Sequence, residues 1–148
     1  MISVENKVFK IDTCDTSYVF SITDKGHAEH IYYGAKLPSA DADVLRLKNT
    51  IMLGTTVDYD GETQGYSLDT LPQEYSGIGK GDYRHTPIEL IMPDGCFVND
   101  FCYDSYEIVD SAYTADNCEL PFAHGEAQTL KITLKDRKYA GVSLVLSY

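Results

Sequence analysis

The feature that most constrains the fold of this chain is a two-residue alternation of apolar and polar side chains. It is clearest in residues 17–23, 130–135 and 141–148. This period puts apolar side chains on one face of an extended strand and polar side chains on the other. Antiparallel sheets with one solvated face have this pattern. We therefore predict three antiparallel strands, each with one buried face.

Further segments support an all-β fold with little helix. Weaker strand candidates are residues 2–11, 28–33, 88–92 and 101–109. The one helical candidate, residues 41–49, is short, and residues 34–81 contain many turn formers but little clean periodicity. The 12 tyrosines suit half-buried pleated surfaces. The fold class that we predict is all-β, with two packed antiparallel sheets.

Charge and hydropathy exclude several classes of partner. The chain has 148 residues, enough for one buried core, and a formal net charge of −11. Such an acidic chain repels nucleic acid and anionic lipid. No apolar run reaches membrane-helix length, and the first ten residues lack a hydrophobic signal core. We expect a cytoplasmic protein with no nucleic-acid or membrane partner.

The cysteines and histidines give no metal-binding pattern. The four cysteines, which form no C-x-x-C pair, are Cys14, Cys96, Cys102 and Cys118. In a cytosolic chain we expect reduced structural thiols that pack as small apolar groups. His27 and His30 are three residues apart, an offset that places side chains on opposite faces of a strand. We therefore expect no metal site.

Two short motifs resemble ligand-binding loops, but each also fits an ordinary turn. Residues 77–82 are glycine-rich with a lysine, but their spacing fits no phosphate-binding loop and no helical pattern follows. A tight glycine turn is the favoured interpretation. Residues 58–62 resemble part of a calcium loop but lack the third ligand and the distal glutamate, which favours a solvated acidic turn.

Nothing in the sequence specifies catalysis. No serine lies in a G-x-S-x-G elbow, and 23 carboxylates make chance acidic pairs certain. At the end of the chain the alternation runs to Tyr148 without a turn or polar tail. Since termini are usually looser, we expect the sandwich to be truncated here and to continue beyond this residue.

A specific string then identifies a family. Residues 67–84, SLDTLPQEYSGIGKGDYR, resemble the signature of the amino-terminal domain of family 36 α-galactosidases. The similarity extends to residues 16–34 and 129–148, so it covers nearly the whole chain. Departures lie in residues 36–64 and at residues 85–86.

The resemblance implies a large twisted antiparallel β-sandwich, a supersandwich, over residues 1–148, followed by a catalytic (β/α)₈ barrel. The parent enzyme would remove terminal α-galactosyl groups from oligosaccharides such as raffinose or melibiose, with retention of configuration. Two carboxylates of the barrel would act as the nucleophile and the acid/base, without a metal or an organic cofactor. A barrel needs about 250 residues, so no catalytic residue is expected in this chain.

For this domain the resemblance implies support of the barrel of the same polypeptide, homo-oligomer formation and shaping of the galactoside pocket. It makes Asp69, Asp82 and Arg84 interface or structural residues. An internal salt bridge between Asp82 and Arg84 is an equally good interpretation. Residues 36–64 are the candidate lining of a neighbouring subunit's pocket. The alternative is a stand-alone carbohydrate-binding sandwich, which the absence of tryptophan, the best stacking residue, disfavours.

Overall fold

Four antiparallel strands from the first quarter of the chain form one sheet in the order β1-β2-β3-β4. The strands are β1 (Ile2–Glu5), β2 (Val8–Asp12), β3 (Thr16–Ile22) and β4 (Ala28–Ala35). The computed structural model describes residues 1–39, 41–46, 58–63, 65–113 and 125–148. The predicted strand over residues 17–23 is confirmed as β3, and the candidate over residues 28–33 as β4.

The single candidate strand over residues 2–11 is in fact a hairpin. Asn6 and Lys7 lie between β1 and β2 with φ of 48° and 61°. Two consecutive residues with positive φ are the mark of a type I′ turn, whose twist suits a two-residue hairpin. The chain therefore reverses within a segment whose apolar pattern continues on both sides of the turn.

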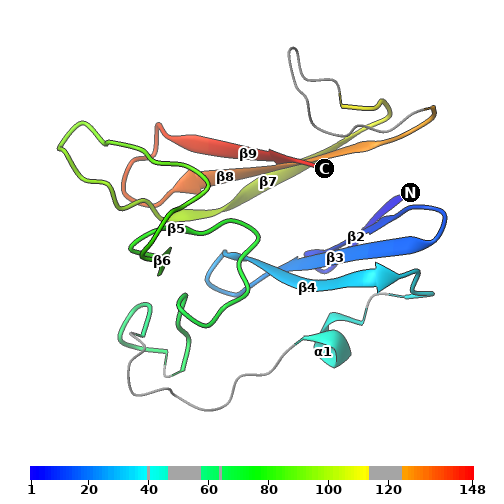
Figure 1. Cartoon of the computed structure of the whole chain (residues 1–148), viewed down its shortest axis with the longest axis horizontal. Helices are drawn as coiled ribbons and strands as arrows, with labels where there is room; N and C mark the ends of the chain where they lie inside the picture. The colour runs from blue at the N-terminus through cyan, green and yellow to red at the C-terminus, as the bar shows by residue number, and fades with distance from the viewer. Residues whose placement is uncertain (40, 47–57, 64, 114–124) are drawn as a thin grey trace.

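A second antiparallel sheet has the order β7-β8-β9. Its strands are β7 (Phe101–Val109), β8 (Thr129–Asp136) and β9 (Ser143–Ser147). They confirm the strands predicted over residues 101–109, 130–135 and 141–148. Between the sheets in sequence lie the short helix α1 (Ala42–Leu45) and a two-stranded parallel pair, β5 (Gly77–Ile78) and β6 (Gly81–Asp82). Figure 1 shows the sheets as two layers.

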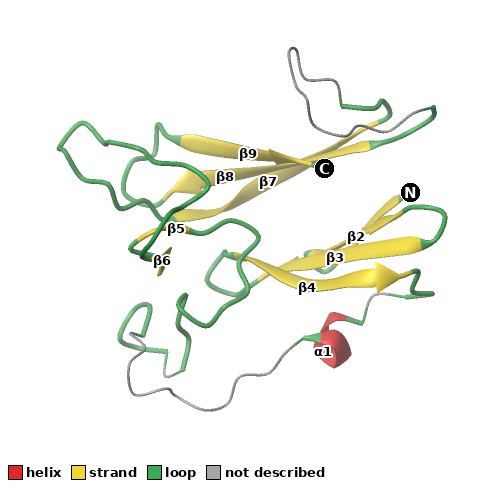
Figure 2. Ribbon diagram, in the orientation of Figure 1, coloured by secondary structure: helices red, strands yellow, loops and turns green. Residues whose placement is uncertain are grey.

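The core lies between these layers and confirms the all-β sandwich. Phe9 and Phe20 of the first sheet are fully buried and stack with ring centroids 4.8 Å apart. The second sheet contributes its buried side chains from β8, namely Leu130, Ile132 and Leu134. Each fully buried side chain of this kind contributes roughly 1.5–3 kcal/mol to the free energy of unfolding. Figure 2 shows how much of the remaining chain is loop.

One expectation about the first sheet is wrong: the second face of β3 is not solvated. Ser17, Val19 and Ser21, which alternate with the core-facing residues, are all buried. The chain after β4 returns across this face. The Leu37 N–H donates to Ser17 Oγ at 2.9 Å, and Arg46 Nη2 donates to Ser21 Oγ at 3.0 Å.

The strand expected over residues 88–92 does not form. Pro87 and Pro93 flank it and lack the N–H groups that a ladder needs, and the Ile91 side chain is 71% exposed. The predicted helix is present as α1, although residues 47–49 of that candidate lie outside the described residues. No helix in the described ranges is long and apolar enough to cross a membrane.

The expectation of buried structural cysteines is wrong for Cys14, which is exposed in the turn between β2 and β3. Cys96 and Cys102 are partly buried, and all three thiols are free. Cys118 lies outside the described residues.

Candidate functional site

The segment of residues 67–84 covers the outer edge of β4. The His30 N–H donates to the Pro72 carbonyl at 2.7 Å, and the Glu74 N–H donates to the Ala28 carbonyl at 2.9 Å. Gln73 and Glu29 form an antiparallel bridge between these two bonds. The segment thus satisfies backbone groups of an edge strand that would otherwise be open to another chain.

The Gln73 side chain holds the rest of the segment together. Its Nε2 donates to the carbonyls of Leu68 at 3.2 Å and Lys80 at 3.0 Å. Gly81, with φ of +96°, lies so close to the Leu68 backbone that a Cβ there would be 2.6 Å from the Leu68 carbonyl oxygen. The glycine turn predicted over residues 77–82 is confirmed, with the Gly79 N–H donating to the Asp82 carbonyl at 2.8 Å.

Glu74 ties this segment to both sheets. Its side chain is 3% exposed, and its carboxylate accepts bonds from Tyr18 Oη at 2.7 Å and Tyr148 Oη at 2.6 Å. His30 Nδ1 lies 3.0 Å from Glu74 Oε1. Because Tyr18 belongs to β3 and Tyr148 follows β9, one buried carboxylate joins the two layers of the sandwich.

The Glu74 cluster predicts a loss of stability at alkaline pH. Burial, together with the Glu74 carboxylate, raises the pKa of Tyr18 and Tyr148 above the ordinary tyrosine value. In the unfolded chain these phenols ionise near pH 10, whereas in the native state they stay protonated. Stability from this source is complete below about pH 10 and is lost as the pH rises above it.

Urea unfolding between about pH 8 and 11 measures this loss. We expect Tyr148→Phe to flatten the alkaline decline of the unfolding midpoint. An unchanged pH slope in this variant would show that Tyr148 does not contribute.

A second polar cluster lies where the turn before β4 meets the start of β7. His27 is 3% exposed, and its Nδ1 lies 2.8 Å from Tyr66 Oη while its Nε2 lies 3.0 Å from Asp100 Oδ1. Tyr59 donates its hydroxyl to Asp100 Oδ2 at 2.6 Å, and its ring packs edge-on against His27. The sequence showed none of this, because His27 and Asp100 are far apart in the chain.

Electrostatics in this second cluster favour charged Asp100 and a neutral thiol at Cys102. Burial alone would raise the pKa of Asp100, but bonds from His27 and Tyr59 outweigh burial, so the pKa lies below its ordinary value. Burial, and then the Asp100 charge, raises the pKa of the Cys102 thiol to about 11. The Lys80 ammonium lies 3.7 Å from Asp100 Oδ2 and partly balances its charge.

The three site residues proposed from sequence lie on the outside of the same segment. Asp69 and Arg84 are exposed, and Asp82 is partly buried. Asp82 Oδ1 accepts the Arg84 backbone N–H at 3.0 Å, which closes a turn. Within the described residues the Arg84 guanidinium makes no ion pair. Asp69 faces the Tyr83 hydroxyl and raises the pKa of Tyr83 by hydrogen bonding.

The remaining sequence candidates have local roles. His27 and His30 contact different partners, as their spacing predicted. Asp60 accepts the backbone N–H groups of Glu62 and Thr63 and pairs with Lys25, which fits the acidic turn rather than a calcium loop. Of residues 36–64, the predicted pocket lining, residues 40, 47–57 and 64 lie outside the described residues.

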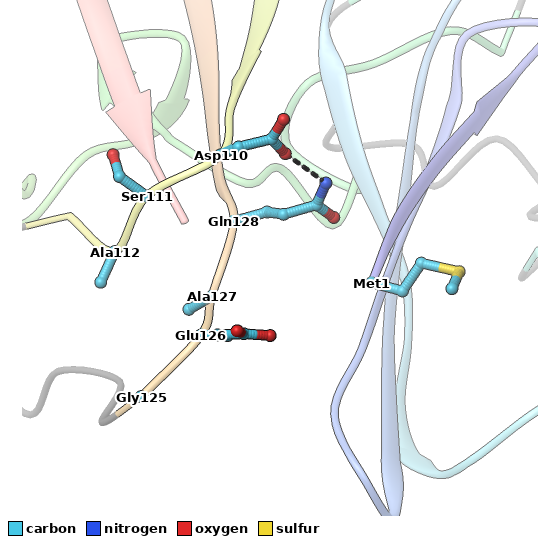
Figure 3. A pocket seen from close by; sticks show the side chains of 8 residues that line it. All are labelled: Met1, Asp110, Ser111, Ala112, Gly125, Glu126, Ala127 and Gln128. Carbon is cyan, nitrogen blue, oxygen red and sulfur yellow. Dashed lines mark hydrogen bonds between the residues drawn. The ribbon is translucent and has the colours of Figure 1, made fainter.

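Two of the hollows that the described residues line carry no catalytic constellation. One of about 520 Å³ lies between the start of β1 and the residues that precede β8 (Figure 3). There Gln128 donates to Asp110 Oδ1 at 2.8 Å and accepts the Ile2 N–H at 3.1 Å. Gln128 thereby links the two sheets, and the other lining side chains are small or exposed.

Comparison with known proteins gives a consistent result. The model of the glycosyl hydrolase family 36 N-terminal domain matches residues 26–148. The bifunctional alpha-galactosidase/sucrose kinase AgaSK of Mediterraneibacter gnavus is 35% identical over 143 residues, which are 96% of this chain and 15% of that protein. The chain spans 15–20% of the length of the curated relatives that it matches.

Solved structures share the whole fold. The alpha-galactosidase AgaB from Geobacillus stearothermophilus superposes with a TM-score of 0.85 at 25% identity, covering 100% of this chain and 20% of that one. An alpha-galactosidase AgaA variant from the same organism, in complex with raffinose, gives a TM-score of 0.83 at 25% identity. That match covers 96% of this chain and 20% of the AgaA chain.

Proposed function

The chain belongs to the glycosyl hydrolase family 36 N-terminal domain family, and from this premise we propose that it is the non-catalytic first domain of an α-galactosidase. The observation that supports this is the coverage: alpha-galactosidases match this chain over nearly its whole length, while it spans only 15% of AgaSK. A (β/α)₈ barrel of about 250 residues has room in the remainder of such a protein.

The substrate class of the parent enzyme is the terminal α-galactosyl group of oligosaccharides such as raffinose or melibiose. The support is the raffinose complex of the similar AgaA variant. Retaining hydrolysis needs two carboxylates about 5–5.5 Å apart on either side of the scissile bond. In this proposal both carboxylates come from the barrel, and this domain holds the barrel in place.

We propose that the barrel packs on the face formed by residues 83–98 and the neighbouring Asp69. This face exposes large apolar side chains that a solvated surface does not need: Tyr83 is 66% exposed, Ile91 71% and Phe97 50%. Arg84 offers a planar guanidinium that suits a carboxylate of the barrel. Assembly into a homo-oligomer through the same domain is part of this proposal.

The decisive experiment compares the full-length protein with residues 1–148 alone. We expect the full-length protein to hydrolyse a chromogenic α-galactoside and raffinose, and the isolated chain to hydrolyse neither, because the catalytic carboxylates lie in the barrel. Turnover by the isolated chain, or its absence in the full-length protein, would contradict the proposal.

A stand-alone carbohydrate-binding module is the second candidate. The observation that favours it is the exposure of tyrosine rings such as Tyr33, at 69%, on which a sugar can stack. Titrating galactose and raffinose into residues 1–148 tests it. Saturable binding, with a gene that stops soon after codon 148, would favour the module over the α-galactosidase domain.

A further inference from the structure

Three side chains that can bind a metal converge in the second polar cluster. His27 lies just before β4, Asp100 just before β7, and Cys102 in β7. His27 Nε2 is 3.0 Å from Asp100 Oδ1, and Cys102 Sγ is 3.8 Å from that nitrogen and 3.9 Å from that oxygen. In a tetrahedral zinc site the ligand atoms are about 3.3–3.7 Å apart. Shifts of a few tenths of an ångström would let the three atoms share one ion.

The other atoms of the same side chains already have partners. His27 Nδ1 lies 2.8 Å from Tyr66 Oη, and Asp100 Oδ2 accepts the Tyr59 hydroxyl. Metal-binding imidazoles almost always use their second nitrogen in a hydrogen bond, which fixes the orientation of the ring. These outer contacts leave Nε2 and Oδ1 facing Cys102 Sγ, as a shared ion requires.

A small cavity beside the cluster is lined by residues with buried polar atoms that lack a hydrogen-bond partner within the described part of the chain. It measures about 10 Å³, room for a single water, and His27, Asp100, Asn99 and Tyr75 are among its lining residues. Asn99 is 3% exposed, and its Oδ1 finds no partner among the described residues. The Tyr75 hydroxyl is likewise buried without one. A metal-bound water in this cavity would donate to Asn99 Oδ1.

Among the described residues, the nearby cations do not occupy the three donor atoms. Lys80 and Arg137 lie over the Tyr59 ring, at 4.9 Å and 5.5 Å from its centroid. Lys80 approaches Asp100 through Oδ2, the oxygen that faces Tyr59. The positive charges of Lys80 and Arg137 weaken the attraction of the site for a metal cation. The Asp100 carboxylate and a Cys102 thiolate, however, supply two negative charges directly at the ion.

We propose that His27, Asp100 and Cys102 bind one Zn²⁺ ion per chain, with a water as the fourth ligand. A thiolate, an imidazole and a carboxylate form a donor set that suits zinc. On binding, the Cys102 thiol releases its proton to solvent and the sulfur bonds to the ion. Such an ion would fasten β7 to the loop before β4, and this inference is independent of the proposed function.

Cobalt substitution tests this in the full-length protein, free of affinity tags and stripped with a chelator. We expect one Co²⁺ per chain with a sulfur-to-cobalt charge-transfer band, displaced by one equivalent of Zn²⁺. Cys102→Ser should abolish the band and weaken zinc binding more than about tenfold. Cys14→Ser, which removes an exposed thiol outside the cluster, should leave both unchanged.

A measurement on the unmutated protein guards against a variant that fails to fold. Bound Zn²⁺ should protect Cys102 from alkylation, mapped by peptide, while Cys14 stays reactive. Absence of the charge-transfer band, equal zinc retention by wild type and Cys102→Ser, or unprotected Cys102 would each overturn the proposal. The three groups would then be a hydrogen-bonded cluster only.

Discussion

Glu74→Ala is expected to lower the free energy of unfolding by about 3–5 kcal/mol. The substitution removes the acceptor of the Tyr18 and Tyr148 hydroxyls and the partner of His30. Each buried polar group left without a partner costs about 1–3 kcal/mol. The cost falls on both layers at once, because these three side chains come from β3, β4 and the end of β9.

Urea unfolding of residues 1–148 measures this effect. Glu126→Ala is the matched control, since Glu126 is exposed and changes there are usually within about 0.5 kcal/mol. Glu74→Gln keeps one acceptor and should cost less than alanine. If Glu74→Ala and Glu126→Ala unfold at the same urea concentration, Glu74 does not join the layers as we describe.

Strand positions were predictable from sequence because the alternation is local. β3, β8 and β9 follow from every second side chain, and each was predicted within a few residues. The segment over residues 88–92 failed because an apolar run alone does not decide between a strand and a loop. There the prolines at 87 and 93 outweigh the run. The buried second face of β3 was not predictable, since it depends on where the chain after β4 returns.

The two polar clusters could not be predicted from the sequence. Glu74 lies inside the segment that identified the family, but nothing local shows that its partners are Tyr18 and Tyr148. Cys102 is 75 residues from His27 in sequence, and no ligand spacing connects them. Contacts of this kind arise only when β7 is placed beside the loop that precedes β4, which is a property of the sandwich.

Gly81→Ala is expected to lower the free energy of unfolding by about 3 kcal/mol or more. A φ of +96° disfavours any residue with a Cβ, at about 1–2 kcal/mol. The new methyl would also collide with Gln73 Nε2 and lie 2.6 Å from the Leu68 carbonyl oxygen. Forcing extra atoms into a packed site adds about 1–3 kcal/mol.

Gly95→Ala separates these two causes. Gly95 also has a positive φ, +79°, but nothing lies within 4 Å of a Cβ built there. Gly95→Ala should therefore lower the free energy of unfolding only by the cost of the backbone conformation, about 1–2 kcal/mol. Adding Gln73→Ala to Gly81→Ala removes one collision but not the one with the Leu68 backbone, so stability should not return. Equal losses at Gly81 and Gly95 in urea unfolding would show that residues 67–84 yield to the methyl group rather than enclose Gly81 rigidly.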